Sequence, residues 1–164
     1  MKIGIVSDTH GQAERLREAM ELFRVHAVDA VVHCGDVGSE RCVELLGSAD
    51  AEAWLVAGNV DRNIPALSAA AARHAVHFAG DVVELPLGDG RNLVATHGHD
   101  AAILGELIGG AKFPYVCHGH THKRRDERVG AVRVINPGAL FNARVHTVAV
   151  LDTDADTVEH LIVS

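Results

Sequence analysis

The sequence has few of the residues that mark secreted or membrane proteins. Its three cysteines, Cys34, Cys42 and Cys117, are an odd number without Cys-x-x-Cys spacing, which favours neither a disulfide framework nor a structural zinc site. No apolar run approaches the ~20 residues that cross a bilayer, and the first residues lack a secretory signal pattern. We therefore expect a cytoplasmic protein with reduced thiols and no membrane partner.

Positive charge is also scarce. Lysine and arginine number 15 against 22 aspartates and glutamates, for a formal net charge of -7. A protein that binds the nucleic-acid backbone needs clustered cations to replace counterions, so we expect no stable nucleic-acid binding. A small phosphorylated substrate remains compatible with this charge, because bound metal ions can dominate the local field.

Three common catalytic motifs are missing. The chain has no glycine-rich phosphate loop followed by lysine, no Gly-x-Ser-x-Gly and no His-Glu-x-x-His, which excludes P-loop, serine-hydrolase and zincin chemistry.

Aromatic residues make up only 4% of the chain, so the core is built from aliphatic side chains. A length of 164 residues suits one domain, which we place at residues 1–164.

The hydrophobic pattern predicts alternating strands and helices first and mainly strands later. We predict three strand–helix units, with strands at 3–6, 30–34 and 53–57. The first helix is predicted at 12–25 and the third at 65–74, and the second begins after an N-cap at Ser39 and ends near residue 47. From about residue 76 we predict strands at 81–87, 92–96, 113–117, 125–129, 131–135, 147–151 and 157–163, and a helix at 100–108. Such units form neighbouring parallel strands. The economical architecture is two packed sheets with helices outside and the active-site loops along one edge.

Five predicted strands end in residues that bind metal ions. These ends are Ser7-Asp8-Thr9-His10-Gly11, Gly35-Asp36, Gly58-Asn59, His97-Gly98-His99 and His118-Gly119-His120-Thr121-His122. Ligands of open α/β sheets bind at the carboxyl ends of the strands. A His-x-His pair can point both imidazoles the same way, whereas His118 need not join them and a lone histidine after a strand is commonly a core residue. The pattern predicts a metal centre assembled from loops.

The ligand types limit the metal. Carboxylate, amide oxygen and imidazole without thiolate favour Mn²⁺, Fe²⁺, Zn²⁺ or Ni²⁺. Seven candidate ligands are too many for one tetrahedral ion but suit two ions that share a carboxylate, a recurrent arrangement in phosphate-ester hydrolysis. Two divalent ions, two aspartates and a hydroxide leave about one positive charge, which favours an anionic substrate.

Five ordered motifs carry a family resemblance. Asp8-x-His10, Gly35-Asp36, Gly58-Asn59-Val60-Asp61, His97-Gly98-His99 and Gly119-His120-Thr121-His122, together with Ile135-Asn136-Pro137-Gly138, resemble the calcineurin-like metallophosphoesterases, specifically their small YfcE-type phosphodiesterase branch. The likeness spans residue 1 to about 151. It implies an α/β (α+β) fold, a four-layer αββα sandwich of two mixed sheets flanked by helices.

The resemblance also implies roles for single residues. Asp8, His10 and His122 would hold the first metal, Asn59, His97 and His120 the second, and Asp36 would bridge them. A metal-bridging hydroxide would attack phosphorus in line, with Asn59 orienting a phosphate oxygen. His99 is the candidate to contact the substrate phosphate or to protonate the leaving oxygen. Manganese is the first expectation, with nickel, iron and zinc as alternatives.

Two positions depart from the family pattern. Val60 stands where many phosphoesterases place a histidine that acts as general acid, a loss that can cost ~10²- to 10⁴-fold with a poor leaving group. Ala139 replaces a serine that is frequent after Asn-Pro-Gly in this branch.

We expect a phosphodiesterase acting on a small diester. The alternatives are a phosphomonoesterase and a non-catalytic protein-interaction scaffold like the retromer subunit of the same fold, although all seven ligand positions are filled here. The resemblance also suggests a homo-oligomer.

Three further features have plainer interpretations. Asp152-x-Asp154-x-Asp156 starts like a calcium loop but lacks the glycine and glutamate that follow, so we predict a hairpin turn. Lys123-Arg124-Arg125 is read as a solvated strand start rather than a phosphate contact. His33 is either a partner of Asp36 or a hydrogen-bonded core histidine.

Overall fold

A computed structural model describes residues 1–164. Strands and helices alternate in the first half of the chain, in the order β1 (Lys2–Val6), α1 (Ala13–Val25), β2 (Ala30–His33), α2 (Glu40–Gly47), β3 (Glu52–Val56), α3 (Ile64–Arg73) and β4 (Val76–Ala79). The second half contains β5 (Val82–Pro86), β6 (Asn92–Thr96), α4 (Ala101–Gly109), β7 (Tyr115–Cys117), β8 (Arg125–Val129), β9 (Val132–Asn136), β10 (Thr147–Asp152) and β11 (Thr157–Ile162). None of these helices has the length and hydrophobicity needed to cross a membrane.

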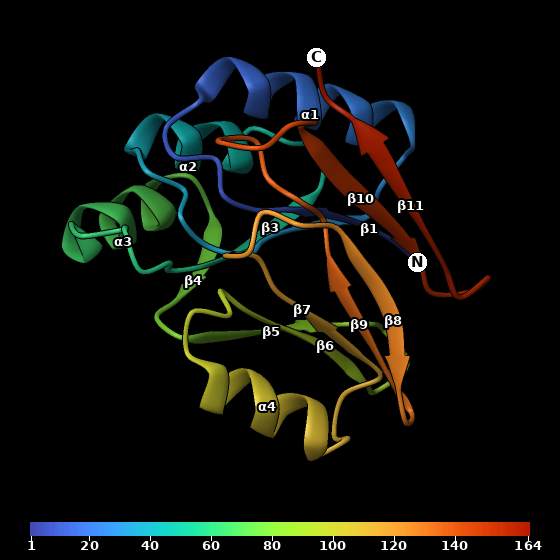
Figure 1. Ribbon diagram of the computed structural model, residues 1–164. Helices are drawn as coiled ribbons and strands as arrows, with labels where there is room; N and C mark the ends of the chain where they lie inside the picture. The colour runs from blue at the N-terminus through green and yellow to red at the C-terminus, as the bar shows by residue number, and fades with distance from the viewer.

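The strands form two mixed sheets (Figure 1). The six-stranded sheet has the order β11-β10-β1-β2-β3-β4, and its strands β1 to β4 are parallel, as the three strand–helix units predict. The five-stranded sheet has the order β5-β6-β7-β9-β8, with β6, β7 and β9 parallel. The carboxyl ends of the parallel strands meet along one edge, where the ligand-bearing loops lie.

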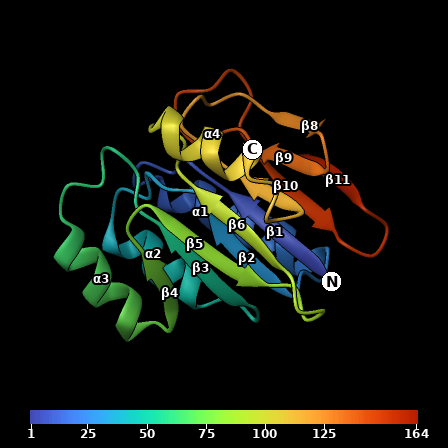
Figure 2. The same ribbon diagram turned by 90° about the horizontal axis from the view of Figure 1, so that it is seen from below.

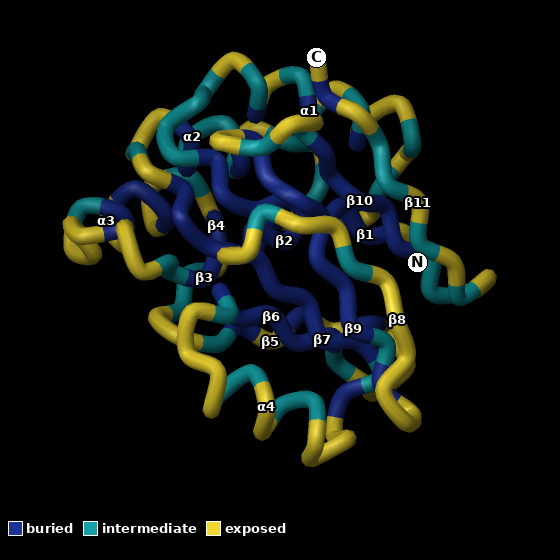
Figure 3. The backbone as a smooth tube through the Cα atoms, in the orientation of Figure 1, coloured by how far each residue is buried: buried dark blue, intermediate teal, exposed yellow.

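Four layers result, which confirms the αββα prediction. Helices α1, α2 and α3 cover the outer face of the six-stranded sheet, and α4 covers the outer face of the five-stranded sheet (Figures 1 and 2). Alternation along β1 shows how one strand serves two cores. Ile3 and Ile5 enter the cluster between the sheets, while Val6 packs under the helices. The central strands of both sheets are accordingly the most buried part of the chain, whereas the edge strands β8 and β11 and the helix α4 contain no buried residue (Figure 3).

Most predicted elements are present within a few residues of their predicted bounds. Ser39 caps α2, since its hydroxyl oxygen accepts the Cys42 N–H at 3.2 Å. Asp152 begins a hairpin turn between β10 and β11 and accepts the N–H groups of Asp154 and Ala155, so the hairpin prediction is confirmed. Strand β4 was not predicted. It has four residues, of which only Val76 is buried, so it leaves no apolar run in the sequence.

Candidate metal centre

The first two ligand loops bond to each other through their backbones. The Asp8 N–H donates to Gly35 O at 3.0 Å, and the His10 N–H donates to Asp36 O at 2.8 Å. Five candidate ligands have left-handed backbone angles, with φ between 47° and 66°: Asp8, His10, Asp36, His120 and His122. Residues other than glycine adopt this region at a cost in free energy, and such strain clusters at functional sites.

In each of the two aspartates, one carboxylate oxygen accepts hydrogen bonds from the protein and the other accepts none from a backbone N–H or a hydroxyl group. Asp8 Oδ2 accepts the Ser7 hydroxyl at 2.6 Å and the His120 N–H at 3.0 Å. Asp36 Oδ1 accepts the Val60 N–H at 2.9 Å. The remaining oxygens, Asp8 Oδ1 and Asp36 Oδ2, face the candidate ligand histidines. The hydrogen bonds therefore orient both carboxylates before any cation binds.

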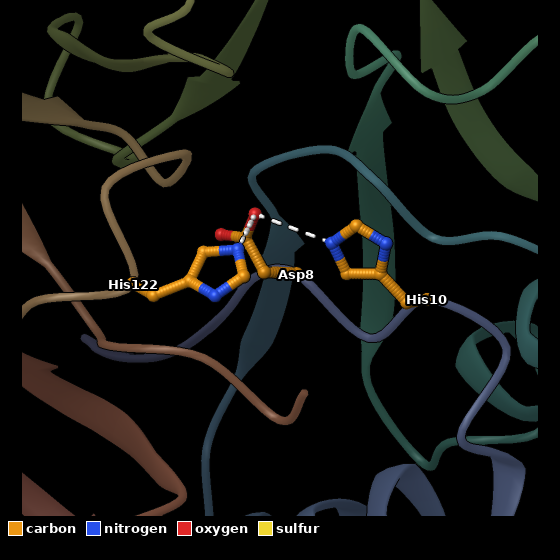
Figure 4. A group of neighbouring side chains, drawn as sticks. All are labelled: Asp8, His10 and His122. Atoms are coloured by element: carbon orange, nitrogen blue, oxygen red, sulfur yellow. Dashed lines mark ion pairs between the residues drawn. The ribbon is translucent and has the colours of Figure 1, made fainter. Parts of the chain in front are cut away.

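The first group of side chains consists of Asp8, His10 and His122, whose ligand atoms lie within 4.8 Å of one another. His122 Nε2 lies 3.1 Å from Asp8 Oδ1, and His10 Nε2 lies 3.8 Å from it. Figure 4 shows the two imidazoles turned toward the carboxylate from opposite sides. These are the three residues expected at the first metal.

The second group consists of Asp8, Asp36 and His97. His97 Nε2 lies 3.3 Å from Asp36 Oδ2 and 3.0 Å from Asn59 Oδ1. Asp36 Oδ2 also lies 3.5 Å from His10 Nε2, so this oxygen faces a histidine of each group. Asp8 belongs to both groups as well, which the sequence did not indicate.

Backbone carbonyls orient two of the histidines. His97 Nδ1 lies 2.8 Å from Cys34 O, and His122 Nδ1 lies 3.3 Å from Asn142 O. A carbonyl can only accept, so the Nδ1–H of each ring donates to it. This arrangement leaves the Nε2 lone pairs for a cation, as is common for metal-binding histidines.

Acceptor atoms converge in both groups, and this convergence requires positive charge. Asp8 Oδ1 and His10 Nε2 are buried and make no hydrogen bond. Burial alone would raise the pKa of the Asp36 carboxyl, but hydrogen bonds from His97 and the Val60 N–H lower it. Burial would lower the pKa of His97, but Asp36 and Cys34 O raise it. A proton or a metal ion satisfies such a cluster, and the carboxylate and imidazole donors fit divalent ions.

His99 and His120 lie at the exposed side of the second group. The ring centroid of His120 lies 5.2 Å from that of His97, and the ring of His99 lies 5.5 Å from that of His97. Both side chains are exposed. Neither belongs to the two compact groups, and both rings lie beside that of His97 at the rim of the second group.

Asp61 supports the site, although the sequence suggested no role for it. Its buried carboxylate accepts three backbone N–H groups, from Val37 at 3.2 Å, Gly38 at 2.9 Å and Gly58 at 2.9 Å. It thereby ties the loop that carries Asp36 to the loop that carries Asn59. Its place two residues after Asn59 was the only available signal.

Asn136 supports the loop between Gly119 and His122 in the same way. Its buried Nδ2 group donates to Gly119 O at 2.9 Å and to Thr121 Oγ1 at 3.2 Å, while Oδ1 accepts the Gly138 N–H. This explains why the Asn-Pro-Gly motif accompanies the histidine motifs. His118, beside that loop, bonds to Gly119 O and faces Arg125, so it does not join the ligands.

His33 is a core histidine. Its Nδ1 accepts the Gly35 N–H at 3.2 Å, so its Nε2–H donates to Thr9 Oγ1 at 2.8 Å. The ring's hydrogen bonds therefore go to Thr9 and Gly35, not to Asp36. Full burial lowers the pKa of His33 to about 3.

The buried His33 makes stability fall with acid. Its folded pKa lies below the unfolded value of 6.5, so its contribution is complete above pH 6.5 and declines by about 1.4 kcal/mol per pH unit below it. When the pH is lowered from 7.5 to 5, we expect the free energy of unfolding of His33→Gln to fall by about 2 kcal/mol less than that of wild type. Urea unfolding in chelator measures this difference. The matched variant of the exposed His77, His77→Gln, should follow wild type, and equal losses in all three proteins would contradict the assignment.

Comparison with known proteins agrees with this geometry. A profile of the calcineurin-like phosphoesterase superfamily domain matches residues 1–156. Phosphodiesterase MJ0936 of Methanocaldococcus jannaschii is 31% identical over 165 residues, which cover 99% of both chains. A solved structure described as a novel archaeal phosphodiesterase superposes with a TM-score of 0.91 at 30% identity, over 99% of this chain and all of the other. YfcE, a phosphoesterase from E. coli, has the same fold, with a TM-score of 0.67 at 22% identity over the whole of both chains.

Proposed function

Because the chain belongs to the calcineurin-like phosphoesterase superfamily, we propose that this metal-dependent hydrolase cleaves small phosphodiesters at a centre of two divalent ions. The observation that carries the proposal is the convergence of carboxylate and imidazole ligand atoms from four loops, among which Asp8 Oδ1 and His10 Nε2 are buried without a hydrogen bond. Asp36 Oδ2 lies 3.5 Å from His10 Nε2 and 3.3 Å from His97 Nε2. A carboxylate oxygen in that position suits a ligand shared by two ions.

We assign the ligands accordingly. Asp8, His10 and His122 would hold one ion, Asn59, His97 and His120 would hold the other, and Asp36 would be shared by both. Manganese is the first candidate, and nickel, iron or zinc suit the same donors. Ions bound here would supply Lewis acidity toward the phosphate and lower the pKa of a bound water.

The chain's own residues position the substrate. Asn59 is exposed, and its Oδ1 faces His97, so its NH₂ group is free to donate to a phosphate oxygen. His99 stands exposed beside His97 and can contact the phosphate or protonate the leaving oxygen. Val60 supplies no acid on the other loop, so we expect activity to favour esters with good leaving groups.

The test is hydrolysis of bis-p-nitrophenyl phosphate by metal-stripped protein titrated with Mn²⁺, with p-nitrophenyl phosphate alongside. The proposal requires metal-dependent turnover of the diester well above that of the monoester. Faster turnover of the monoester would make the protein a phosphomonoesterase. Stoichiometric binding of Mn²⁺, Ni²⁺, Fe²⁺ or Zn²⁺ without turnover would favour a protein-interaction scaffold.

Replacing His99 by alanine should slow the diester reaction and leave the metal content intact. We expect a loss of ~10²-fold, typical of a group that assists proton transfer. Turnover and metal content after dialysis measure the two effects. His77→Ala removes another exposed histidine, on β4, and should behave as wild type. Loss of metal in His99→Ala would show that His99 is a ligand.

The cytoplasmic location, the homo-oligomer and the single domain at residues 1–164 stay predictions. Sedimentation of the purified chain tests the oligomer.

A further inference from the structure

Phe141 lies beside the first group of ligands, and the proposed reaction does not use it. Its ring centroid lies 4.9 Å from that of His10, and the two planes meet at 41°. The residue is 39% exposed. A large aromatic ring that covers a candidate ligand on one side and faces solvent on the other is available to a substrate.

Bonds on both sides of Phe141 fix the segment that carries it. The Leu140 side chain is fully buried, and its carbonyl accepts a hydrogen bond from Arg15 Nη1 at 3.2 Å. On the other side, Asn142 O accepts the bond from His122 Nδ1. The exposed ring is thus presented on an anchored backbone, which reduces the entropy that binding would cost.

A second exposed apolar side chain stands near the other group of ligands. Val60 is 41% exposed, and its N–H donates to Asp36 Oδ1. An exposed apolar residue therefore adjoins each of the two groups. This border suits a substrate whose charged phosphate is attached to apolar groups.

We propose that Phe141 is a specificity-determining residue that stacks on an aromatic ring carried by the phosphodiester, as in the base of a nucleoside ester. This inference rests on the proposed function, since the phosphate must bind at the centre for the ring to reach Phe141. A protein aromatic that stacks on a base makes a large contribution to affinity without reading its identity. The site would accordingly select nucleoside esters as a class.

Two esters with the same leaving group test the proposal. The p-nitrophenyl ester of thymidine 5′-phosphate and methyl p-nitrophenyl phosphate both release p-nitrophenolate, so they differ only in the group that remains on phosphorus. The quantity compared is the kcat/KM of the thymidine ester divided by that of the methyl ester. We expect Phe141→Leu to lower this ratio about tenfold, mainly by raising KM for the thymidine ester, and Phe141→Tyr to keep it within about twofold of wild type. Val129→Ala, at a 40% exposed apolar residue on the β8–β9 hairpin, controls for loss of apolar surface.

A binding measurement separates this proposal from the proposed function. Calorimetry with Mn²⁺-loaded protein compares thymidine 5′-monophosphate with methyl phosphate, and Phe141→Leu should weaken the first by about tenfold relative to the second. An unchanged ratio in Phe141→Leu overturns the proposal. Equal losses for both ligands, together with weaker metal binding, also overturn it, because Phe141 would then only hold His10 in place. Failure of wild type to hydrolyse either ester would refute the proposed function, while the calorimetric ratio would still decide the role of Phe141.

Discussion

Replacing Asp36 by alanine is expected to abolish diester hydrolysis and to release metal from both ligand groups. The Asp36 carboxylate is nearly fully buried, and its Oδ2 faces both His10 and His97. Its removal leaves each ion without the shared ligand and leaves the Val60 N–H without its acceptor. The loss should exceed the ~10- to 10²-fold cost of removing a mere partner of a ligand. Metal content after dialysis and turnover at saturating Mn²⁺ measure the two effects.

The matched variant separates charge from shape. Asp36→Asn keeps the volume of the side chain and an oxygen for the Val60 N–H, so it should fold like wild type and still lose metal. Asp81→Ala removes an exposed carboxylate outside the site and should retain full metal and turnover. Retention of two metals per chain in Asp36→Ala would refute the assignment of Asp36 as the shared ligand.

The sequence revealed the fold because packing on both faces leaves a simple pattern. A strand such as β1, covered by α1 on one face and by the second sheet on the other, must be apolar throughout. Its first polar residues then mark its carboxyl end, which is where Asp8 and His10 lie. The same rule pointed to Asp36, Asn59 and His97, which the fold brings together, so most of the candidate site could be predicted from where apolar runs stop.

Other features leave no such pattern. His33 and His97 both follow apolar runs, and only their partners distinguish a core histidine bonded to Thr9 from a candidate ligand that faces Asp36. Asp61 ties two loops together by accepting the N–H groups of Val37 and Gly38, which lie more than twenty residues away in the chain, and no local spacing encodes these bonds. Phe141 is one exposed aromatic in a loop, and its significance depends on the ring of His10 beside it. These are properties of tertiary contacts, which the order of residue types does not determine.

Gly58→Ala is expected to destabilise the protein and to disrupt the site together. A Cβ atom on Gly58 would lie 2.0 Å from Asp36 Oδ1 and 2.3 Å from the backbone nitrogen of Asp36. A side-chain oxygen could rotate away, but the backbone nitrogen cannot, so one of the two ligand loops must move. We expect a loss of about 2 to 3 kcal/mol in the free energy of unfolding, as for other overpacked sites. Urea unfolding of metal-free protein measures this loss.

Metal binding of Gly58→Ala should weaken as well, because the Gly58 N–H donates to Asp61, which ties the two loops together. Gly105→Ala is the matched control. Gly105 lies within α4, and a Cβ there meets nothing within 4 Å, so the variant should gain about 0.5 to 1 kcal/mol from helix propensity and keep its metal. If Gly58→Ala were as stable as wild type and bound Mn²⁺ equally well, the close approach of the two loops would not be needed to hold Asp36 in position. The opposite signs expected for two identical substitutions make the comparison independent of any general effect of alanine on the unfolded chain.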